Sequence, residues 1–328
     1  MPNIAIFSQE HDIHALAIAH ALRQRQDVSA HLIATDALAE SGGIRWHENN
    51  QAPSELRTVE GKWIDLRAQD VIWWRRVNQP QKLVESLPEG ELKDFVNNEW
   101  RTAIFGIAHS SFKGIWVNKP TNDAIAGNKL IQLQAAKEQG FAVPRTLVSQ
   151  DFDAVKTFLS SIGGHGIAKK LMGTRHAPLA TVHINERELD RRGVTLCPAI
   201  YQEKVKAKKH LRVNCFGHQI HTISIDSPIM DWRRDMSVSF SPYALAPEIR
   251  SKLLSMLRRL GLEMGVFDMI LTDKGETIWL ELNTQGQFLF GEGLAKHDLT
   301  NPFCDFLIDL GLNKEVCCRS GDCHPLHS

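Results

Sequence analysis

The stretch that decides the fold is residues 266–283, which read VFDMIL, TDKGE and TIWLELN in succession. The first and last runs are apolar, with one acid in the first and an acid and an amide in the last. The polar run between them contains a glycine and is typical of a turn. The stretch therefore predicts two paired β-strands that carry carboxylates inside otherwise apolar sequence.

The register of this hairpin follows from its turn. If residues 274–275 form a two-residue loop, counting outward places Asp268 directly opposite Glu281. Side chains on a strand alternate between its faces, so Asn283 shares the face of Glu281. A shift of one residue at the turn would move every side chain to the other face. The other face is expected to lie in the core and consists of Phe267, Met269, Leu271, Ile278, Leu280 and Leu282.

Two facing carboxylates in such a strand pair repel each other and lose hydration, so a positive partner is required. One interpretation is a salt bridge from each carboxylate to Lys or Arg. The other is a divalent cation held by Asp268, Glu281 and Asn283. An all-oxygen ligand set suits magnesium, which binds through a few carboxylates and substrate phosphates. The pattern alone leaves both interpretations open.

The first third of the chain alternates short apolar runs with helical patterns. The apolar runs are 4–7, 28–34, 71–74 and 115–117, and the clearest helical patterns are 13–22 and 92–109. Strands separated by helices predict an open, mostly parallel sheet and an α/β fold class. Pro120 interrupts the chain and is taken as a domain boundary.

The rest of the chain predicts a small mixed unit followed by a strand-rich one. Helices are expected at 128–140, 152–162 and 247–261, and strands near 166–171, 180–184, 199–205, 211–216 and 219–225. Asp151 is a suitable cap for the second helix, and glycines end all three. The expected division is an N-terminal domain over 1–120, a central domain over 121–200 and a C-terminal domain over 201–328.

The charge balance argues against a general affinity for polyanions. The 328 residues include 38 Lys plus Arg and 38 Asp plus Glu, so the formal net charge is zero. A nucleic-acid binder or a protein of anionic membranes would show an excess of positive charge. No apolar run approaches the ~20 residues of a membrane span, and the N-terminus lacks the pattern of a signal peptide. We expect a cytoplasmic location, without a nucleic-acid or membrane partner.

Three other patterns receive ordinary interpretations. Six cysteines in a chain this long indicate a reducing compartment rather than a disulfide scaffold, and the tail with Cys317, Cys318, Cys323, His324 and His327 is interpreted as a frayed terminus rather than a metal site. His11 and His14, near a helix start, are expected to be surface or capping residues. Residues 163–170 lack the spacing of a phosphate loop and predict a helix end followed by a strand.

Several spaced motifs together resemble the ATP-grasp carboxylate–amine ligases. Asp268 followed by Glu281-Leu282-Asn283 on the returning strand looks like the metal signature of that superfamily. The other motifs stand in the superfamily's order, namely Asn128-Lys129, 140–146 (GFAVPRT), 166–169 (GIAK), 202–205 (QEKV) and Leu211-Arg212-Val213 with Gly217. Within the superfamily, the chain most resembles the ligases of microviridin-type (graspetide) peptide maturation, through residues 71–76 (VIWWRR) and 231–233 (DWR).

The resemblance implies a fold, cofactors and site residues. The fold would comprise an N-terminal open α/β domain, a small α+β lid and a C-terminal antiparallel-sheet domain, with ATP between the last two. The cofactors would be ATP and Mg²⁺. The implied roles are Lys129 and Lys169 for phosphates, Gln202, Glu203 and Val205 for the base, His210 for the ribose, Asp268, Glu281 and Asn283 for magnesium, and Arg212 and Arg233 for catalysis. Lys169 is preferred to its neighbour Lys170.

Basic residues outside this set have two interpretations each. Lys204, Lys206, Lys208 and Lys209 are expected to be solvated at a strand edge, whereas the resemblance places Arg212 toward the phosphates. Arg75 and Arg76 follow a strand end, where ligands of open sheets gather, and arginine binds carboxylates in a bidentate manner. They, with Arg233, are candidate substrate contacts. The alternative for Arg75 and Arg76 is a salt bridge between domains or within a homodimer.

The activity implied by the resemblance is ATP-dependent activation of Asp or Glu side chains in an acidic precursor peptide, followed by ester or amide macrocyclisation. One alternative is a ligase of the same fold that adds an amino acid or small amine to a protein tail or small molecule. Another is a nucleotide-gated binding protein with weak catalysis. The composition of this chain does not distinguish them.

Overall fold

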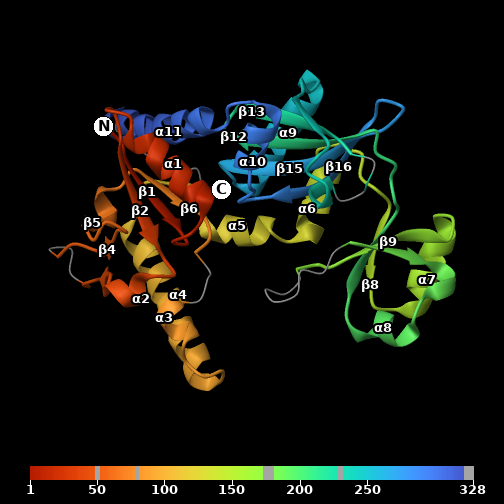
Figure 1. The fold of residues 1–328 in the computed structure, drawn as a ribbon, viewed down its shortest axis with the longest axis horizontal. Coiled ribbons are helices and arrows are strands. Elements are labelled where there is room, and N and C mark those ends of the chain that lie inside the picture. The colour runs from red at the N-terminus through yellow and green to blue at the C-terminus, as the bar shows by residue number, and fades with distance from the viewer. Residues whose placement is uncertain (49–51, 78–80, 173–180, 228, 230–231, 321–328) are drawn as a thin grey trace.

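The computed structural model describes residues 1–48, 52–77, 81–172, 181–227, 229 and 232–320, without the side chains of 234 and 314–320. Three main sheets follow one another along the molecule (Figure 1). The first, from the N-terminal third, lies at one end. The sheet with the carboxylate hairpin lies in the middle, and a small four-stranded sheet lies at the other end. None of the helices within these ranges has the length and apolar composition needed to cross a bilayer.

The first sheet is parallel, as predicted, and its strand order is β2-β1-β6-β7. Its strands are β1 (Asn3–Ser8), β2 (Ser29–Ala34), β6 (Val71–Trp74) and β7 (Ile115–Val117), connected in part by α1 (Ile13–Arg23) and α4 (Glu91–Ser111). Both faces of β6 are buried, as expected for a parallel strand that is covered on both sides. The sequence did not predict the small sheet of β3 (Ile44–Arg45), β4 (Glu55–Arg57) and β5 (Trp63–Asp65), nor the helices α2 (Leu38–Ser41), η1 (Leu66–Ala68) and α3 (Lys82–Glu85).

The small end sheet is antiparallel, with the order β10-β9-β11-β8. It contains β8 (Thr146–Ser149), β9 (His165–Lys169), β10 (Val182–Asn185) and β11 (Ala199–Gln202), with the helices α7 (Phe152–Ser161), η2 (Glu186–Glu188) and α8 (Arg191–Leu196). Asp151 caps α7 through the backbone N–H groups of Asp153 and Ala154, as predicted. Most of the loop between β9 and β10, including Arg175, lies outside the described residues.

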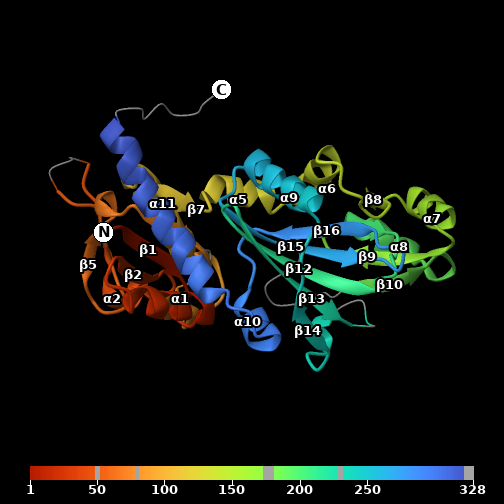
Figure 2. The ribbon, with the colours of Figure 1, turned by 90° about the horizontal axis from the view of Figure 1, so that it is seen from above.

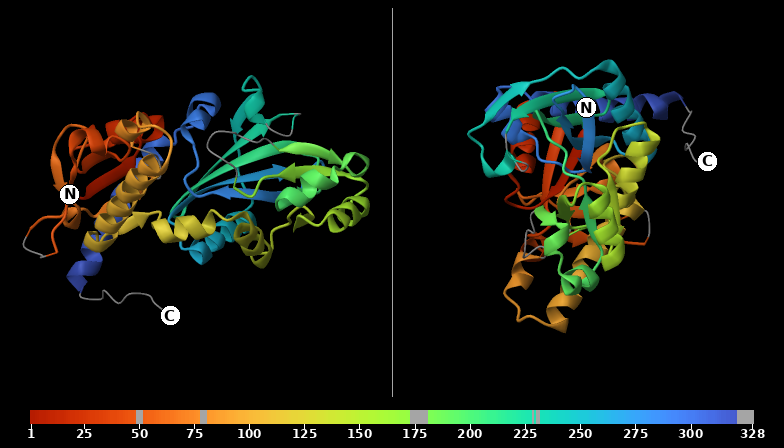
Figure 3. Two further views of the ribbon diagram at one scale, coloured as in Figure 1. Left: turned by 90° about the horizontal axis from the view of Figure 1, so that it is seen from below. Right: turned by 90° about the vertical axis from the view of Figure 1, so that its right-hand side faces the viewer.

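The middle sheet is antiparallel, with the order β14-β13-β12-β15-β16. Its strands are β12 (Lys209–Phe216), β13 (Gln219–Asp226), β14 (Ser239–Pro242), β15 (Met264–Leu271) and β16 (Thr277–Asn283), and η3 (Trp232–Arg234) precedes β14. The helices α5 (Pro120–Ala126), α6 (Lys129–Glu138) and α9 (Pro247–Leu260) cover one face, seen in yellow and cyan in Figure 3. Pro120, at the predicted domain boundary, begins α5, because proline suits the first helical turn.

The end of the chain returns to the first sheet. After α10 (Leu289–Ala295), the helix α11 (Thr300–Ser320) packs against α1 and the first sheet (Figure 2). One apolar cluster therefore contains Ile4, Ile6 and Trp73 from the N-terminal third together with Phe288 and Phe303. The cluster joins the first and middle sheets through a common core. The predicted tail with Cys323, His324 and His327 lies outside the described residues.

Asn118, at the end of β7, links the first sheet to the carboxylate hairpin. Its buried amide Nδ2 donates to the carbonyls of Met264 and Thr284, both at 2.9 Å. Its Oδ1 accepts from the backbone nitrogens of Glu263 at 2.8 Å and Met264 at 2.9 Å. All these groups are paired without water. The amide thus fixes where β15 begins and β16 ends relative to the first sheet.

We predict that Asn118→Ala lowers the free energy of unfolding by about 3 kcal/mol or more, because it leaves several buried polar groups unpaired. Urea denaturation followed by circular dichroism measures the change. Asn122→Ala is the matched control, since the Asn122 amide donates to the carbonyl of Gly261 at an exposed site. The control should cost about 1 kcal/mol or less. Equal losses in the two variants would contradict the linking role of Asn118.

Candidate active site

Asp268 and Glu281 face each other as predicted, but the turn between their strands is longer than predicted and one strand contains a bulge. Asp268 pairs with Glu281, whereas Leu271 pairs with Thr277, so the turn holds five residues rather than two. The register changes by one residue between these pairs, and Leu280 is the extra residue of a β-bulge. A bulge re-aims side chains on its strand, and here it restores the predicted opposition.

The bulge also corrects the predicted core face of β16. Trp279, which pairs with Met269, is 1% exposed and belongs to the core cluster below the middle sheet. Ile278 and Leu280 are only partly buried. The alternation assumed from the sequence fails because the bulge inserts one residue between Trp279 and Glu281.

Each facing carboxylate has a cationic neighbour, as the salt-bridge interpretation predicted. Arg212 on β12 donates from Nη1 to both Asp268 oxygens at 2.8 Å. The Nζ atom of Lys129, at the start of α6, lies 3.8 Å from Glu281 Oε2. Asn283 donates from Nδ2 to Asp268 Oδ2 at 3.1 Å. The structure therefore brings together five residues from four elements, α6, β12, β15 and β16.

Lys169 on β9 points into the same space. Its Nζ donates to Gln202 Oε1 at 2.8 Å. Burial lowers the pKa of the Lys169 ammonium, opposed by the nearby carboxylate of Glu281, and Lys129 lowers this pKa further. Lys170 contributes its backbone carbonyl, which accepts from Lys129 Nζ at 3.3 Å. This arrangement supports the choice of Lys169 over Lys170 as the side chain at the site.

The predicted base-binding segment connects the small sheet to the middle sheet. Gln202 ends β11 and is held by Thr146, whose hydroxyl accepts from Nε2 at 2.8 Å. Glu203 donates its backbone N–H to the carbonyl of Arg145 at 2.9 Å. Val205 is half-buried in the following irregular segment, and the buried ring of His210 lies 3.2 Å from the carbonyl of Ile229. Contacts of these residues with a nucleotide stay predictions.

The predicted substrate arginines differ in accessibility. The side chain of Arg75 is 0% exposed and its Nε donates to Asp12 Oδ2 at 2.6 Å. It is thus closed to a substrate, which corrects that expectation. Its ion pair with Asp12 lies within the predicted N-terminal domain and is therefore neither the inter-domain nor the homodimer salt bridge of the alternative. Arg76 is 39% exposed, at 3.9 Å from the same carboxylate. Arg233, on η3, is exposed, whereas Asp231 of its motif lies outside the described residues. Trp73, Trp74 and Trp232 are buried, as expected for packing residues.

Two residues that support the site were not predicted from the sequence. Gln132 on α6 is buried, donates to the carbonyl of Leu282 at 2.8 Å and accepts from its N–H at 3.0 Å. It thereby extends the hydrogen bonding of edge strand β16 beside Glu281. His14 is buried rather than superficial and contacts the segment after β16. No local sequence pattern predicts either contact, because Leu282 and Phe288 are each more than a hundred residues from their partners Gln132 and His14.

The donor set fits magnesium better than a softer metal. Within the described ranges, no group of three or more His, Cys, Asp or Glu side chains is arranged to hold a metal ion. Asp268, Glu281 and Asn283 provide two carboxylates and an amide, and magnesium commonly completes such a set with waters and substrate phosphates. The described cysteines Cys197, Cys215 and Cys304 are free, and the last two are buried.

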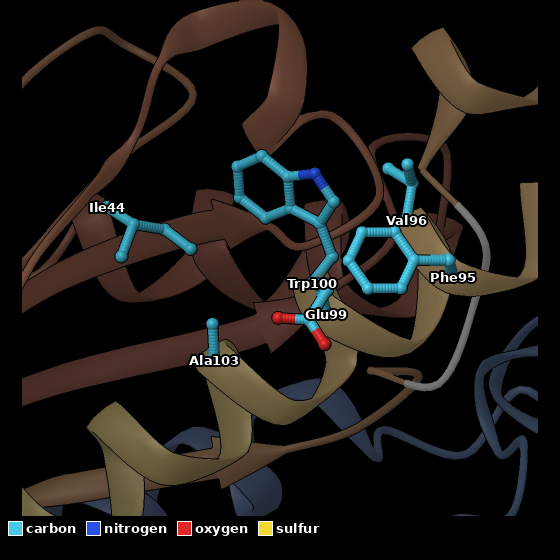
Figure 4. Close-up of a pocket in the computed structure, with 6 residues that line it drawn as sticks. All are labelled: Ile44, Phe95, Val96, Glu99, Trp100 and Ala103. Atoms are coloured by element: carbon cyan, nitrogen blue, oxygen red, sulfur yellow. The ribbon is translucent and has the colours of Figure 1, made fainter. Parts of the chain in front are cut away.

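An apolar pocket elsewhere in the molecule does not have this chemistry. It lies between α4 and β3 in the N-terminal third (Figure 4). Glu99 is the one charged residue of its lining, which otherwise consists of Ile44, Phe95, Val96, Trp100 and Ala103. A triphosphate needs several cationic or N–H donors, so this pocket is a poor site for a nucleotide.

Comparison with known proteins resolves the fold. No protein-family description and no curated protein matches the chain. Solved structures do match over nearly the whole length. The macrocyclase MdnC bound with precursor peptide MdnA, from Microcystis aeruginosa MRC, has a TM-score of 0.80 at 24% identity, covering 95% of this chain and 99% of that one. The chain has the fold of this macrocyclase.

Two solved structures of ATP-grasp ligases match the chain over a similar length. The RiPP-associated ATP-grasp ligase of Chryseobacterium gregarium, in complex with ADP and a leader and core peptide, has a TM-score of 0.83 at 22% identity, covering 96% of this chain and 97% of that one. The ATP-grasp ligase PsnB complexed with a minimal precursor has a TM-score of 0.77 at 21% identity, covering 94% and 99%. The ATP-grasp fold predicted from the motifs is therefore confirmed.

The different placement of the two lysines generates a test. Lys169→Ala removes a partly buried ammonium from the site and should weaken ADP binding about tenfold or more, as expected for loss of a charge-assisted contact. Lys170→Ala is the matched control and should change the affinity by less than about twofold. Isothermal titration calorimetry with ADP measures both. A larger loss of ADP affinity in Lys170→Ala than in Lys169→Ala would mean that Lys170, not Lys169, points into the site.

Proposed function

We propose that the chain is an ATP-dependent, ADP-forming ligase that activates Asp and Glu side-chain carboxylates of a ribosomal precursor peptide and closes ester or amide macrocycles. The observation that carries this proposal is the convergence of Asp268, Glu281 and Asn283 with Lys129 and Arg212 at one end of an ATP-grasp middle sheet. The similarity of fold to MdnC and PsnB, whose structures contain precursor peptides, and to the Chryseobacterium enzyme, whose structure contains a leader and core peptide, supports the choice of substrate.

The nucleotide would lie between the small sheet and the middle sheet. Lys129 and Lys169 would neutralise its phosphates, and the segment from Gln202 to Val205, with His210, would border the base and ribose. Arg212 Nε is buried and has no partner among the described residues, which suits an additional acceptor such as a phosphate or carboxylate oxygen. Magnesium held by Asp268, Glu281 and Asn283 would supply positive charge for the outer phosphates.

The chemistry needs no protein nucleophile. A substrate carboxylate oxygen attacks the γ-phosphorus, the bond to the ADP oxygen breaks, and an acyl phosphate forms. A hydroxyl or amine of the same peptide then attacks the acyl carbon, loses its proton and expels phosphate. The work of Arg212 and the lysines is to position these groups and to stabilise developing charge. Arg233 and Arg76, which are exposed or partly exposed, are the proposed contacts of the acidic substrate.

The proposed domain division is 1–120, 121–200 and 201–328, in which the central domain acts as a lid. The proposed location is the cytoplasm, which provides ATP and keeps thiols such as those of Cys215 and Cys304 reduced. An Asp- or Glu-rich peptide is the proposed partner. Assembly into a homodimer stays a prediction.

The mass of the product tests the activity. Each ester or amide bond closed within one peptide removes one water, so an acidic precursor peptide incubated with the protein, ATP and magnesium should lose about 18 Da per bond. Mass spectrometry measures the successive losses. Losses that mild base reverses identify esters, and stable losses identify amides. A gain in mass would instead indicate intermolecular addition of a small amine or amino acid. Absence of ADP production with any acidic peptide would favour a nucleotide-gated binding protein.

The metal assignment has its own test. Glu281→Gln keeps the size of the side chain but removes one negative charge, so turnover should fall by about 10²-fold or more. Glu276→Gln, in the exposed turn of the same hairpin, is the matched control and should retain wild-type turnover. Turnover is measured as ADP release over a range of magnesium concentrations. Near wild-type turnover of Glu281→Gln at ordinary magnesium would remove Glu281 from the metal site.

A further inference from the structure

The segment 284–289, directly after β16, is held by side chains from the N-terminal third of the chain. This segment follows Glu281 and Asn283 without an intervening element and leads into α10. It packs closely against β15, since a Cβ atom on Gly286 would lie 2.5 Å from Val266 Cβ. Its position therefore determines the direction in which β16 ends.

The first contacts come from β6 and the residue that follows it. Trp73 donates from Nε1 to Gln285 Oε1 at 3.3 Å. Arg75 donates from Nη1 to the Gln285 carbonyl at 3.2 Å. The guanidinium is in turn fixed by Asp12, which also accepts from the hydroxyl of Ser8 at 2.7 Å. Arg75, which is too buried to contact a substrate, thus holds the segment that follows β16.

The second contact comes from α1. The Nε2 atom of His14 accepts from the backbone nitrogens of Phe288 at 2.9 Å and Leu289 at 3.1 Å. The two N–H groups stand at the start of α10, where a helix needs acceptors. Burial, assisted by the charge of Arg75, lowers the pKa of His14 to about 4, so the ring is a neutral acceptor at physiological pH.

The middle of segment 284–289 also contacts the candidate active site. The carbonyl of Gln287 accepts from Arg212 Nη2 at 2.9 Å, while Nη1 of the same guanidinium binds Asp268. A displacement of the segment would therefore move Arg212 as well as the end of β16. The contacts of Gln285, Gln287 and Phe288 form a continuous series of hydrogen bonds. The series runs from β6 and α1 to Arg212, which we place beside the nucleotide phosphates.

From this chain of contacts we infer that His14 is a positioning residue for the proposed magnesium and phosphate site, acting through segment 284–289 together with Trp73 and Arg75. The inference rests on the proposed function. It assigns to the N-terminal third of the chain a part in metal binding, although none of its side chains would touch the metal. Residues that orient metal ligands in this indirect way strongly affect metal affinity.

The experiment compares ADP affinity with and without magnesium in wild-type protein, His14→Leu and His14→Gln, by isothermal titration calorimetry. In His14→Leu, which lacks the acceptor, the gain in ADP affinity on adding magnesium should shrink about tenfold or more. Affinity in EDTA should fall by less than the magnesium-dependent gain does, because only Arg212 among the proposed phosphate contacts bonds to the segment, whereas Lys129 and Lys169 are held by other residues. His14→Gln keeps an acceptor oxygen and should restore most of the magnesium-dependent gain. A role in stability alone would lower the melting temperature without this separation.

The matched control is His20→Leu, which changes an exposed histidine of the same helix and should leave both affinities unchanged. If His14→Leu does not fold, Trp73→Phe removes the bond to Gln285 while an aromatic ring still packs against Phe303, and it should reduce the same gain. A folded His14→Leu, or Trp73→Phe in its place, that keeps the wild-type magnesium-dependent gain overturns the inference.

Amide hydrogen exchange separates the failure of this inference from the failure of the proposed function. Absence of magnesium-dependent ADP binding in wild-type protein would defeat the proposed function and, with it, the assignment of a metal-positioning role. The contact itself is tested without a ligand, since exchange at Phe288 and Leu289 should accelerate in His14→Leu but not in His20→Leu. Unchanged exchange in His14→Leu shows that His14 does not hold the segment and overturns the inference even if the wild-type protein binds magnesium.

Discussion

The site depends on holding two carboxylates, Asp268 and Glu281, opposite each other on neighbouring strands. Their charges repel, and partial burial weakens the hydration that would otherwise offset this repulsion. Arg212 from β12 and Lys129 from α6 stabilise the pair from two sides. Each cation comes from a different element, so the charge balance requires the middle sheet and its covering helix to be assembled. Lys169, which lies within electrostatic reach of the same carboxylates, adds a third cation to the two, and this surplus suits a ligand as negative as a nucleotide phosphate.

The strand with Glu281 lies at the edge of the middle sheet, where backbone groups lack a neighbouring strand. The fold completes this edge with side chains and a short backbone contact. Gln132 bonds both backbone groups of Leu282, and Ala142 forms a parallel bridge with Ile278. Asn118 binds the carbonyl of Thr284 where the strand ends. The edge is thereby fixed along its length.

Sequence patterns predicted the hairpin, the helix caps and the parallel first sheet because these features depend on neighbours in the chain. They also predicted that Asp268 lies opposite Glu281. This prediction holds because two differences from the assumed hairpin have opposite effects on the strand register. A five-residue turn moves the register by one residue, and the bulge at Leu280 moves it back. Sequence alone could not place the bulge, because its position depends on Trp279 filling the space beneath the sheet.

The sequence by itself determined the types of elements, the acidic hairpin and the order of the lysine and arginine motifs, since each rests on local periodicity and residue chemistry. Only the tertiary structure decided which basic side chains reach the site. Arg75 and Arg76 are adjacent and chemically identical, yet one is buried against Asp12 and the other is partly exposed. His14 likewise has only the sequence pattern of a residue near a helix start, and its role as the acceptor for the first N–H groups of α10 follows from the packing of α1 against that helix. Burial and hydrogen bonding between segments hundreds of residues apart are properties of the packed chain, and they have no signature in local sequence.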